Sequence, residues 1–170
     1  MLGVLARRAA GTATGPVLRS ARFSTEAAAA STMMKLNFCL PHETIYKDKD
    51  VDQVIIPGAA GEYGVTMGHS PVVAEMKPGV LQILHGDGKE PEKFFVSAGF
   101  ALTHPTSVTD VTAIEAVRVE EIDADAVKAE YEKAKLAMTA ATDGTREHAE
   151  AQIGVETCVA MGNVIGLSLS

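Results

Sequence analysis

Three glycines in the segment 56–64, Gly58, Gly61 and Gly64, raise the question of a phosphate-binding loop. Loops of that kind use the spacing GxGxxG or GxxxxGK[ST] and open into a helix, whose free amide groups hold the anion. Here the spacing is GxxGxxG, and no helical pattern follows. Glycine also serves tight turns between strands, because it adopts backbone conformations that other residues avoid. We therefore interpret these glycines as turn residues and predict no nucleotide site.

Histidine and cysteine side chains do not form a metal-ligand pattern. Two cysteines, Cys39 and Cys158, lie far apart, and no histidine pair has ligand spacing. The histidines are His42, His69, His85, His104 and His148. We predict no metal and no cofactor, and interpret four histidines as polar surface residues. His69 is kept as a candidate site residue. Both cysteines are expected to be free and at least half-buried.

Carboxylate and hydroxyl groups likewise lack a catalytic arrangement. Asp123 and Asp125 stand where a helix is expected to begin, and an N-cap with a negatively charged first turn accounts for them. Ser97 cannot be the nucleophile of a GxSxG elbow, since Phe95 occupies the position of the first glycine. The sequence therefore predicts a protein that is not an enzyme.

The elements that carry these residues follow from periodicity. Apolar and polar residues alternate with a period of two over most of 35–118, and turn signals such as His104-Pro105-Thr106 separate the runs. About eight to ten short strands at such spacing are typical of a sandwich. We predict a β-sandwich or flattened barrel in this part of the chain.

The period changes after Ile122 to that of a helix. One apolar stripe recurs at helical spacing, and a turn at 142–145 separates it from a second expected helix at 146–164. The stripe is Val127, Tyr131, Ala134 and Met138, and the second helix carries Gly154, Cys158, Gly162 and Gly166 at intervals of four. Each glycine costs roughly 1 kcal/mol of helix propensity, so we expect this ridge to face a closely packed partner helix. An antiparallel hairpin is predicted; the alternative is a glycine-weakened tail.

The first 25 residues contain Arg7, Arg8, Arg19 and Arg22 and no acidic residue. An Arg-rich, acid-free start with many small and hydroxyl residues is typical of a mitochondrial presequence. We expect a leader at 1–23 that is cleaved between Phe23 and Ser24. An ordinary disordered N-terminus is the alternative.

The remainder of the chain is strongly acidic. All 22 acidic residues and 11 Lys and Arg follow residue 25, for a net charge of −11. Nucleic acid is a poor partner for such a surface. A spanning helix is not expected, because the stretch 153–169 is interrupted by Glu156 and Asn163. We divide the rest of the chain into a tail at 24–34, a sandwich at 35–120 and a helical hairpin at 121–170.

Four motifs between residues 57 and 80 resemble the signature of one family, the small central-stalk subunit of F-type ATP synthases, which is called epsilon in bacteria and delta in mitochondria. They are Pro57-Gly58, Gly61-Glu62-Tyr63-Gly64, Gly68-His69-Ser70-Pro71 and Lys77-Pro78-Gly79-Val80. The segments 94–101 and 108–113 resemble its later signatures. The resemblance extends from about Lys35 to the C-terminus and is most specific before Glu120.

This resemblance implies a non-catalytic rotor subunit on the matrix side of the mitochondrial inner membrane. In the family the sandwich links the gamma subunit to the c-ring and transmits torque, and in mitochondria a small epsilon subunit contacts sandwich and hairpin. The loop that faces the c-ring corresponds to Gly61, Glu62, Tyr63 and Gly64. The face toward gamma corresponds to His69, Ser70, Pro71, Val72 and Val73.

Some bacterial members of the family bind ATP at the hairpin through the motif [IL]DxxRA. Here Ile122-Asp123 is followed by Ala124-Asp125-Ala126, so the arginine is missing and a negative charge is added. A triphosphate would lose its cationic partner and meet repulsion. We predict no ATP site.

Two other protein classes are compatible with a β-rich chain of this composition. One is a jelly-roll metalloenzyme, which would need clustered histidine and carboxylate ligands. The other is a mitochondrial β-sandwich adaptor or ligand-binding protein unrelated to a rotor. Co-migration with a large mitochondrial complex on a native gel separates the rotor from both.

Overall fold

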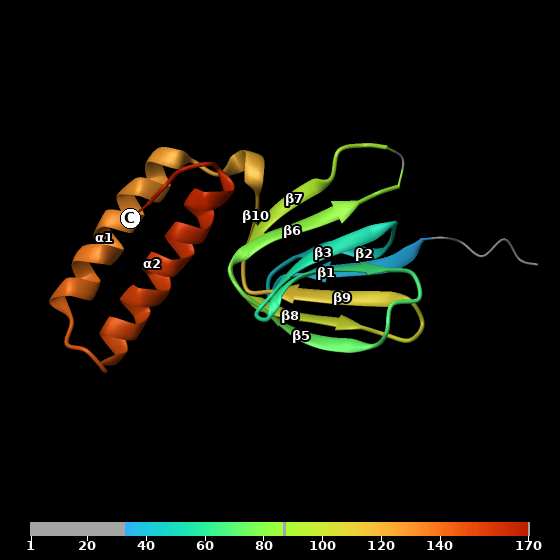
Figure 1. The fold of residues 1–170 in the computed structure, drawn as a ribbon, viewed down its shortest axis with the longest axis horizontal. Helices are drawn as coiled ribbons and strands as arrows, with labels where there is room; N and C mark the ends of the chain where they lie inside the picture. Colours follow the sequence, from blue (N-terminus) through green and yellow to red (C-terminus); the bar gives the residue numbers. More distant parts are fainter. Residues whose placement is uncertain (1–32, 87, 170) are drawn as a thin grey trace, which may run out of the picture. The chain divides into compact units, whose positions relative to one another are not determined.

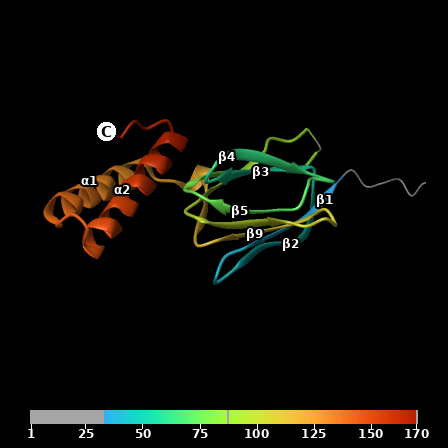
Figure 2. The ribbon, with the colours of Figure 1, turned by 60° about the horizontal axis from the view of Figure 1, so that its bottom comes forward.

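A computed structural model describes residues 33–86 and 88–169 (Figure 1). The expected leader 1–23, the cleavage point between Phe23 and Ser24, and nearly all of the expected tail 24–34 lie outside the described residues. Strand succeeds strand as far as Arg118, and helices account for most of the chain beyond it, as Figures 1 and 2 show. The predicted fold class, a β-sandwich followed by a helical hairpin, is confirmed.

The strands are short, in keeping with the frequent turn residues. They are β1 (Met34–Cys39), β2 (Thr44–Val51), β3 (Gln53–Gly58), β4 (Gly61–Thr66), β5 (Val72–Met76), β6 (Gly79–Leu84), β7 (Glu92–Val96), β8 (Gly99–Thr103), β9 (Val108–Ala113) and β10 (Ala116–Arg118). A single 3₁₀ turn, η1 (Val119–Glu121), leads to helices α1 (Ala124–Ala140) and α2 (Arg146–Val164).

All ten strands belong to one sheet that folds over on itself. The order is β10-β7-β6-β3-β5-β8-β9-β1-β2, and β4 pairs with β3 outside this path. Strands β1 and β9 run parallel. The fold-over lies at β3 and β5, which share only the register pair Gly58–Met76. Because β2 and β10 end the order, the sandwich has two edges that no ladder joins.

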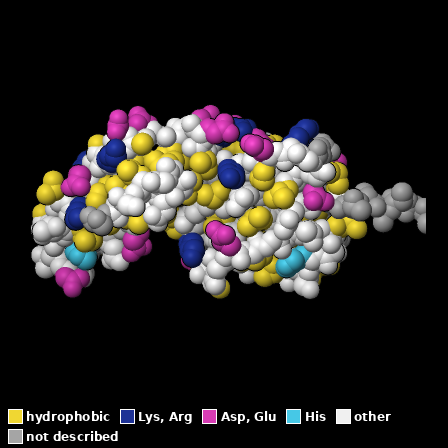
Figure 3. All heavy atoms as spheres, turned by 45° about the horizontal axis from the view of Figure 1, so that its top comes forward, with side chains coloured by type: hydrophobic (Ala, Val, Ile, Leu, Met, Phe, Trp, Pro, Cys, Tyr) yellow, Lys and Arg dark blue, Asp and Glu magenta, His cyan; other side chains and the backbone are white. Residues whose placement is uncertain are grey.

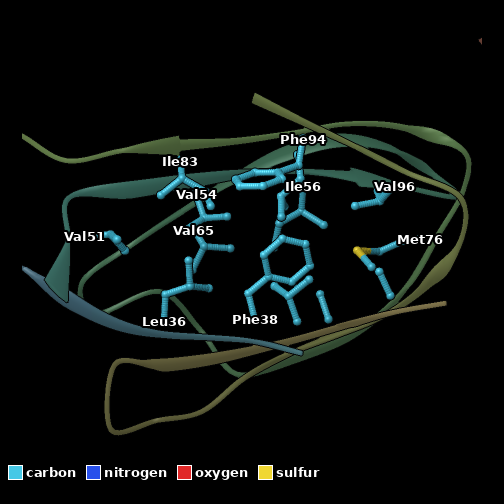
Figure 4. Packing of buried hydrophobic residues seen from close by; sticks show 14 of the residues in the cluster. Leu36, Phe38, Val51, Val54, Ile56, Val65, Met76, Ile83, Phe94 and Val96 are labelled. Carbon is cyan, nitrogen blue, oxygen red and sulfur yellow. The ribbon is translucent and has the colours of Figure 1, made fainter. Parts of the chain in front are cut away.

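Apolar side chains from both layers fill the space between them (Figure 4). Phe38 of β1 meets Phe94 of β7 edge to face, with ring centroids 5.5 Å apart. Leu36, Val54 and Ile56 are fully buried around them. Burying one such side chain contributes about 1.5–3 kcal/mol, so this core is the main source of stability of the sandwich.

The hairpin helices begin where the sequence predicts. The Asp123 carboxylate accepts from the amides of Asp125, at 2.9 Å, and Ala126, at 3.4 Å. The Thr145 hydroxyl accepts from the His148 amide, at 3.3 Å. Val127 and Tyr131 of α1 pack with Cys158 of α2 in a separate buried cluster. The predicted stripe and N-cap are confirmed.

The glycine ridge is only partly what the spacing suggested. A Cβ at Gly154 would lie 3.3 Å from that of Ala134, so close packing against α1 is confirmed there. At Gly162 the nearest neighbours are instead the Leu167 carbonyl and the Leu169 side chain, because the chain folds back after α2. Gly166 lies beyond the end of α2 with φ +75°. It ends the helix in a left-handed conformation, so the ridge interpretation is wrong for Gly162 and Gly166.

Replacing Asp123 by alanine is expected to destabilise the hairpin by about 1 kcal/mol, because two amides of the first helical turn lose their acceptor. Urea unfolding followed by circular dichroism measures the loss. Asp125→Ala is the matched control, since Asp125 is exposed and makes only a 3.4 Å ion pair with Lys128; we expect a change below about 0.5 kcal/mol. Equal losses in both variants would contradict the cap assignment. The absence of an ATP site at Asp123 stays a prediction.

Candidate interaction site

The segment Gly61–Gly64, expected to be a loop, is the first half of strand β4. It pairs with β3 in the register Gly58–Gly61, Pro57–Glu62 and Ile56–Tyr63. Only two residues, Ala59 and Ala60, connect the strands, and Gly61 adopts φ +135° beside this tight turn. The loop interpretation is therefore wrong: the turn glycines shorten the connection so far that the motif becomes strand.

This strand geometry separates Glu62 from Tyr63, which were expected to contact one partner surface together. Successive side chains of a strand point to opposite faces. Glu62 is exposed, whereas Tyr63 packs against the core from the other face of β4. Glu62 alone is therefore available at the outer surface of the β3–β4 hairpin.

Tyr63 instead joins the residues expected to face gamma. Its ring lies 6.4 Å from that of His69, measured between centroids, and both line a hollow of about 400 Å³. The β3–β4 turn and the 72–75 segment of β5 form the other walls. Thus Gly61, Tyr63, His69, Val72 and Val73 come together in one depression, while Ser70 and Pro71 do not line it.

The Tyr63 hydroxyl is buried at this hollow and has no hydrogen-bond partner among the described residues. Burial raises the pKa of the Tyr63 phenol. The His69 Nδ1 atom lies 2.7 Å from the Ser70 carbonyl oxygen, which fixes the orientation of the imidazole ring. These residues offer a shaped, largely apolar surface with no nucleophile and no paired acid and base.

Sequence reasoning missed an adjoining apolar area. Val73, Phe100 and Ile114 are 71%, 55% and 60% exposed. Phe100 and Ile114 line a second hollow, of about 320 Å³, with Pro41. Large exposed apolar side chains gathered on one sheet face mark an interaction surface. We call the residues lining the two hollows the docking face. An aromatic residue at an outward position of β8 was the available signal.

Two carboxylates collect polar partners elsewhere on the sandwich. Glu92 accepts from the Tyr46 hydroxyl and from Arg118 Nη1, at 2.7 Å, and lies 3.1 Å from His85 Nε2. Burial alone would raise the pKa of Glu92, but these hydrogen bonds outweigh it and lower that pKa. His85 is half-buried in this cluster, so the expectation of a plain surface histidine is wrong for it.

Asp110 forms the second cluster, with Asn37 Nδ2 at 2.6 Å and His104 Nε2 at 2.7 Å. Burial opposes ionisation of Asp110, yet the hydrogen bonds from Asn37 and His104 lower its pKa. Both clusters join neighbouring strands and leave no group free to attack a substrate. Across residues 33–86 and 88–169, no three His, Cys, Asp or Glu side chains are gathered as metal ligands are.

Surface charges of both signs are mixed on the face shown in Figure 3, where Asp and Glu side chains lie among Lys and Arg. That face presents no continuous basic field of the kind that binds nucleic acid. Within the described part of the chain, neither helix has the length and hydropathy needed to cross a membrane.

Comparison with known proteins identifies the family. Residues 33–119 match the β-sandwich domain of the ATP synthase delta/epsilon chain. The mitochondrial delta subunit of the F(1) complex from Dictyostelium discoideum is 42% identical over 151 residues, which cover 86% of this chain and 85% of that subunit. The mitochondrial delta subunit from Saccharomyces cerevisiae is 40% identical over 144 residues, covering 85% and 88%.

Solved structures agree with these sequence relatives. A chain in the Euglena gracilis mitochondrial ATP synthase, a complex described as OSCP, F1 and c-ring, superposes with a TM-score of 0.72 at 27% identity, covering 79% of this chain and 82% of the other. A chain of the Tetrahymena thermophila central stalk and c-ring shares the fold, with a TM-score of 0.61 at 13% identity and coverage of 76% and 94%. This chain belongs to the delta/epsilon family of ATP synthase subunits, as its motifs predict.

Proposed function

We propose that this chain is a non-catalytic central-stalk subunit of a mitochondrial ATP synthase, held at the matrix side of the inner membrane. It links the gamma subunit to the c-ring and transmits torque during proton-driven ATP synthesis. The observation that carries this proposal is the 40–42% identity to mitochondrial delta subunits along most of the chain.

The physical properties of the sandwich suit this role. Its core is close-packed, with Phe38, Leu36 and Ile56 fully buried between the layers. Close-packed interiors have low compressibility. A block of this kind placed between two larger bodies transmits force with little deformation. No chemistry is required of it, in keeping with carboxylate clusters that are occupied by structural hydrogen bonds.

Different surfaces of the chain serve different partners. Glu62, on the outer side of the β3–β4 hairpin, faces a basic residue in the polar loops of the c-ring. The docking face, with Tyr63, His69, Val73 and Phe100, covers gamma. The small mitochondrial epsilon subunit lies against sandwich and hairpin. This division rests on the family resemblance, on the exposure of Glu62 and on the apolar character of the two hollows.

Native gel electrophoresis of mitochondrial membranes, followed by immunodetection of this chain, tests the proposed assembly. We expect co-migration with the complete ATP synthase. Migration as a small species, or with an unrelated complex, would instead favour a β-sandwich adaptor. Cross-linking mass spectrometry on the intact complex then locates the partners of Glu62, Lys77 and the hairpin lysines.

Glu62→Lys is expected to weaken association with the c-ring by about tenfold, because a favourable charge contact becomes a repulsive one. Proton-driven ATP synthesis should fall with it. The stability of the isolated chain should change by less than about 0.5 kcal/mol, as for other exposed positions. Reconstituted complexes report ring association and synthesis, and thermal unfolding reports stability.

The matched control for this prediction is Glu90→Lys. Glu90 is exposed between β6 and β7, at the Gln53 end of β3, whereas the β3–β4 turn follows Gly58 at the other end. The charge change is the same and the location differs. Unaltered ring association and synthesis in Glu62→Lys would overturn the ring assignment of Glu62.

A further inference from the structure

The docking face contains one carboxylate at its centre, that of Glu75. The two hollows share Glu75 as a common wall and no other described residue. On one side of it lie Tyr63, His69 and Val73, and on the other Phe100 and Ile114. Glu75 also stands directly opposite Phe100 in the β5–β8 ladder. A charged group is therefore placed where apolar surface lies on both sides.

The side chain of Glu75 has no partner within the sandwich. It is exposed, and no hydrogen bond or ion pair joins its carboxylate to another described residue. Its backbone, by contrast, is fixed, because the Glu75 carbonyl accepts from the Ala59 amide at 2.9 Å. Lys77, two residues along, makes no ion pair with it. Neither fold nor local electrostatics accounts for a carboxylate at this position.

Covering the docking face would remove this carboxylate from water. Desolvating an unpaired charge is strongly unfavourable, whereas a charge paired across an interface is tolerated and selects the partner. The covering surface must therefore supply a cation at this point. Apolar side chains that enter the hollows must flank that cation on both sides.

We propose that Glu75 is the specificity-determining charge of the docking face, where it pairs with a lysine or arginine of the gamma subunit that stands between two apolar side chains. The inference rests on the proposed function, because it takes gamma as the occupant of this face. It adds the chemistry of the contact: one basic residue opposite Glu75, one apolar side chain near Tyr63 and Val73, and one near Phe100 and Ile114.

The test measures binding of the full mature chain to purified gamma subunit from the same organism at several salt concentrations. Glu75→Gln keeps the shape of the side chain and removes its charge, so we expect affinity to fall about ten- to a hundredfold and to depend less on salt. Glu75→Lys should weaken binding further. Thermal unfolding of both variants should match the unaltered chain, because the carboxylate makes no internal contact.

Val73→Asp is the control for the face itself, since it puts an unpaired carboxylate on the wall of the first hollow. If Val73→Asp weakens binding while Glu75→Gln leaves it unchanged or tighter, the Glu75 inference is wrong and the docking face stands. If neither variant alters affinity, gamma does not cover this face and both proposals fail. A scan of Lys→Glu and Arg→Glu changes in gamma against Glu75→Lys should find one position that restores binding; restoration at none would also overturn the pairing.

Discussion

Replacing Gly99 by alanine is expected to destabilise the sandwich by about 3–5 kcal/mol, the range of severe single substitutions. Gly99 begins β8 with φ +155°, a conformation that other residues rarely adopt. A Cβ there would lie 2.0 Å from the carbonyl oxygen of Thr112 and 2.9 Å from the Cα of Ala113. Both atoms belong to the backbone of β9, so no side-chain rotation can relieve the overlap.

Relief would require β8 and β9 to separate at the pair Gly99–Ala113. The same residue pairs with Met76 of β5, so separation also disturbs the fold-over of the sheet. Urea unfolding with a two-state fit measures the loss, provided that the denaturant slope is unchanged.

Gly68→Ala is the matched control for Gly99→Ala. Gly68 has φ +78°, yet no atom lies within 4 Å of an added Cβ. Only the left-handed backbone penalty of about 1–2 kcal/mol applies there. A Gly99→Ala loss no larger than that of Gly68→Ala would show that the strands yield more easily than this packing implies.

Short-range signals explain what the sequence could predict. The cap at Asp123 and the bounds of α2 depend on residues within one helical turn, so they are legible without tertiary structure. The alternation that predicts the sandwich is equally local. The misjudged glycines obey the same rule. Gly154 faces α1 as expected, but Gly166 could not be distinguished from a ridge residue, because the spacing of four continues past the end of α2.

Strand pairing could not be predicted, because it joins residues distant in the sequence. Lys35 of β1 pairs with Val108 of β9, and Gly58 of β3 with Met76 of β5. No local pattern specifies either pair. The docking face depends on these pairings, since the position of Phe100 beside Glu75 is set by the β5–β8 register. Motif resemblance therefore identified His69 and Val73 but not Glu75 or Ile114.

Turn length decided the remaining site residue. The motif containing Glu62 and Tyr63 has the composition of a loop, and only the two-residue connection 59–60 makes it a strand. Once it is a strand, the two side chains lie on opposite faces. A single structural fact thus divides one expected contact into two, with Glu62 assigned to the ring and Tyr63 to the docking face.

Glu92→Ala is expected to destabilise the sandwich by about 2–3 kcal/mol, because it leaves the partners of a half-buried carboxylate unsatisfied. Edge strand β2 contributes Tyr46 and edge strand β10 contributes Arg118, and both side chains bind Glu92 of β7. Tyr46 and Arg118 also contact the Phe94 ring, at 6.5 Å between ring centroids and 4.9 Å from the guanidinium carbon. Since no ladder joins β2 to β10, these side chains close the seam of the sandwich.

Loss of the seam should be visible locally as well as globally. Amide hydrogen exchange in β2 and β10 should accelerate in Glu92→Ala more than exchange in β3, which is paired with its neighbours through backbone bonds. A uniform acceleration across all strands would contradict a seam function. Tyr46→Phe removes one hydrogen bond only and should cost about 1 kcal/mol.

The seam also predicts a pH dependence with a definite sign. Burial and the hydrogen bond with Glu92 raise the pKa of Tyr46 to about 12, so its hydroxyl remains a donor throughout the neutral range. The pKa of Glu92 is lowered from 4.5, and a carboxyl with a lowered pKa stabilises the folded state above its unfolded pKa. This contribution is lost as the pH falls through the folded pKa. Glu92→Gln cannot ionise, so its unfolding free energy should decline less between pH 5 and pH 3 than that of the unaltered chain, and equal slopes would refute the assignment.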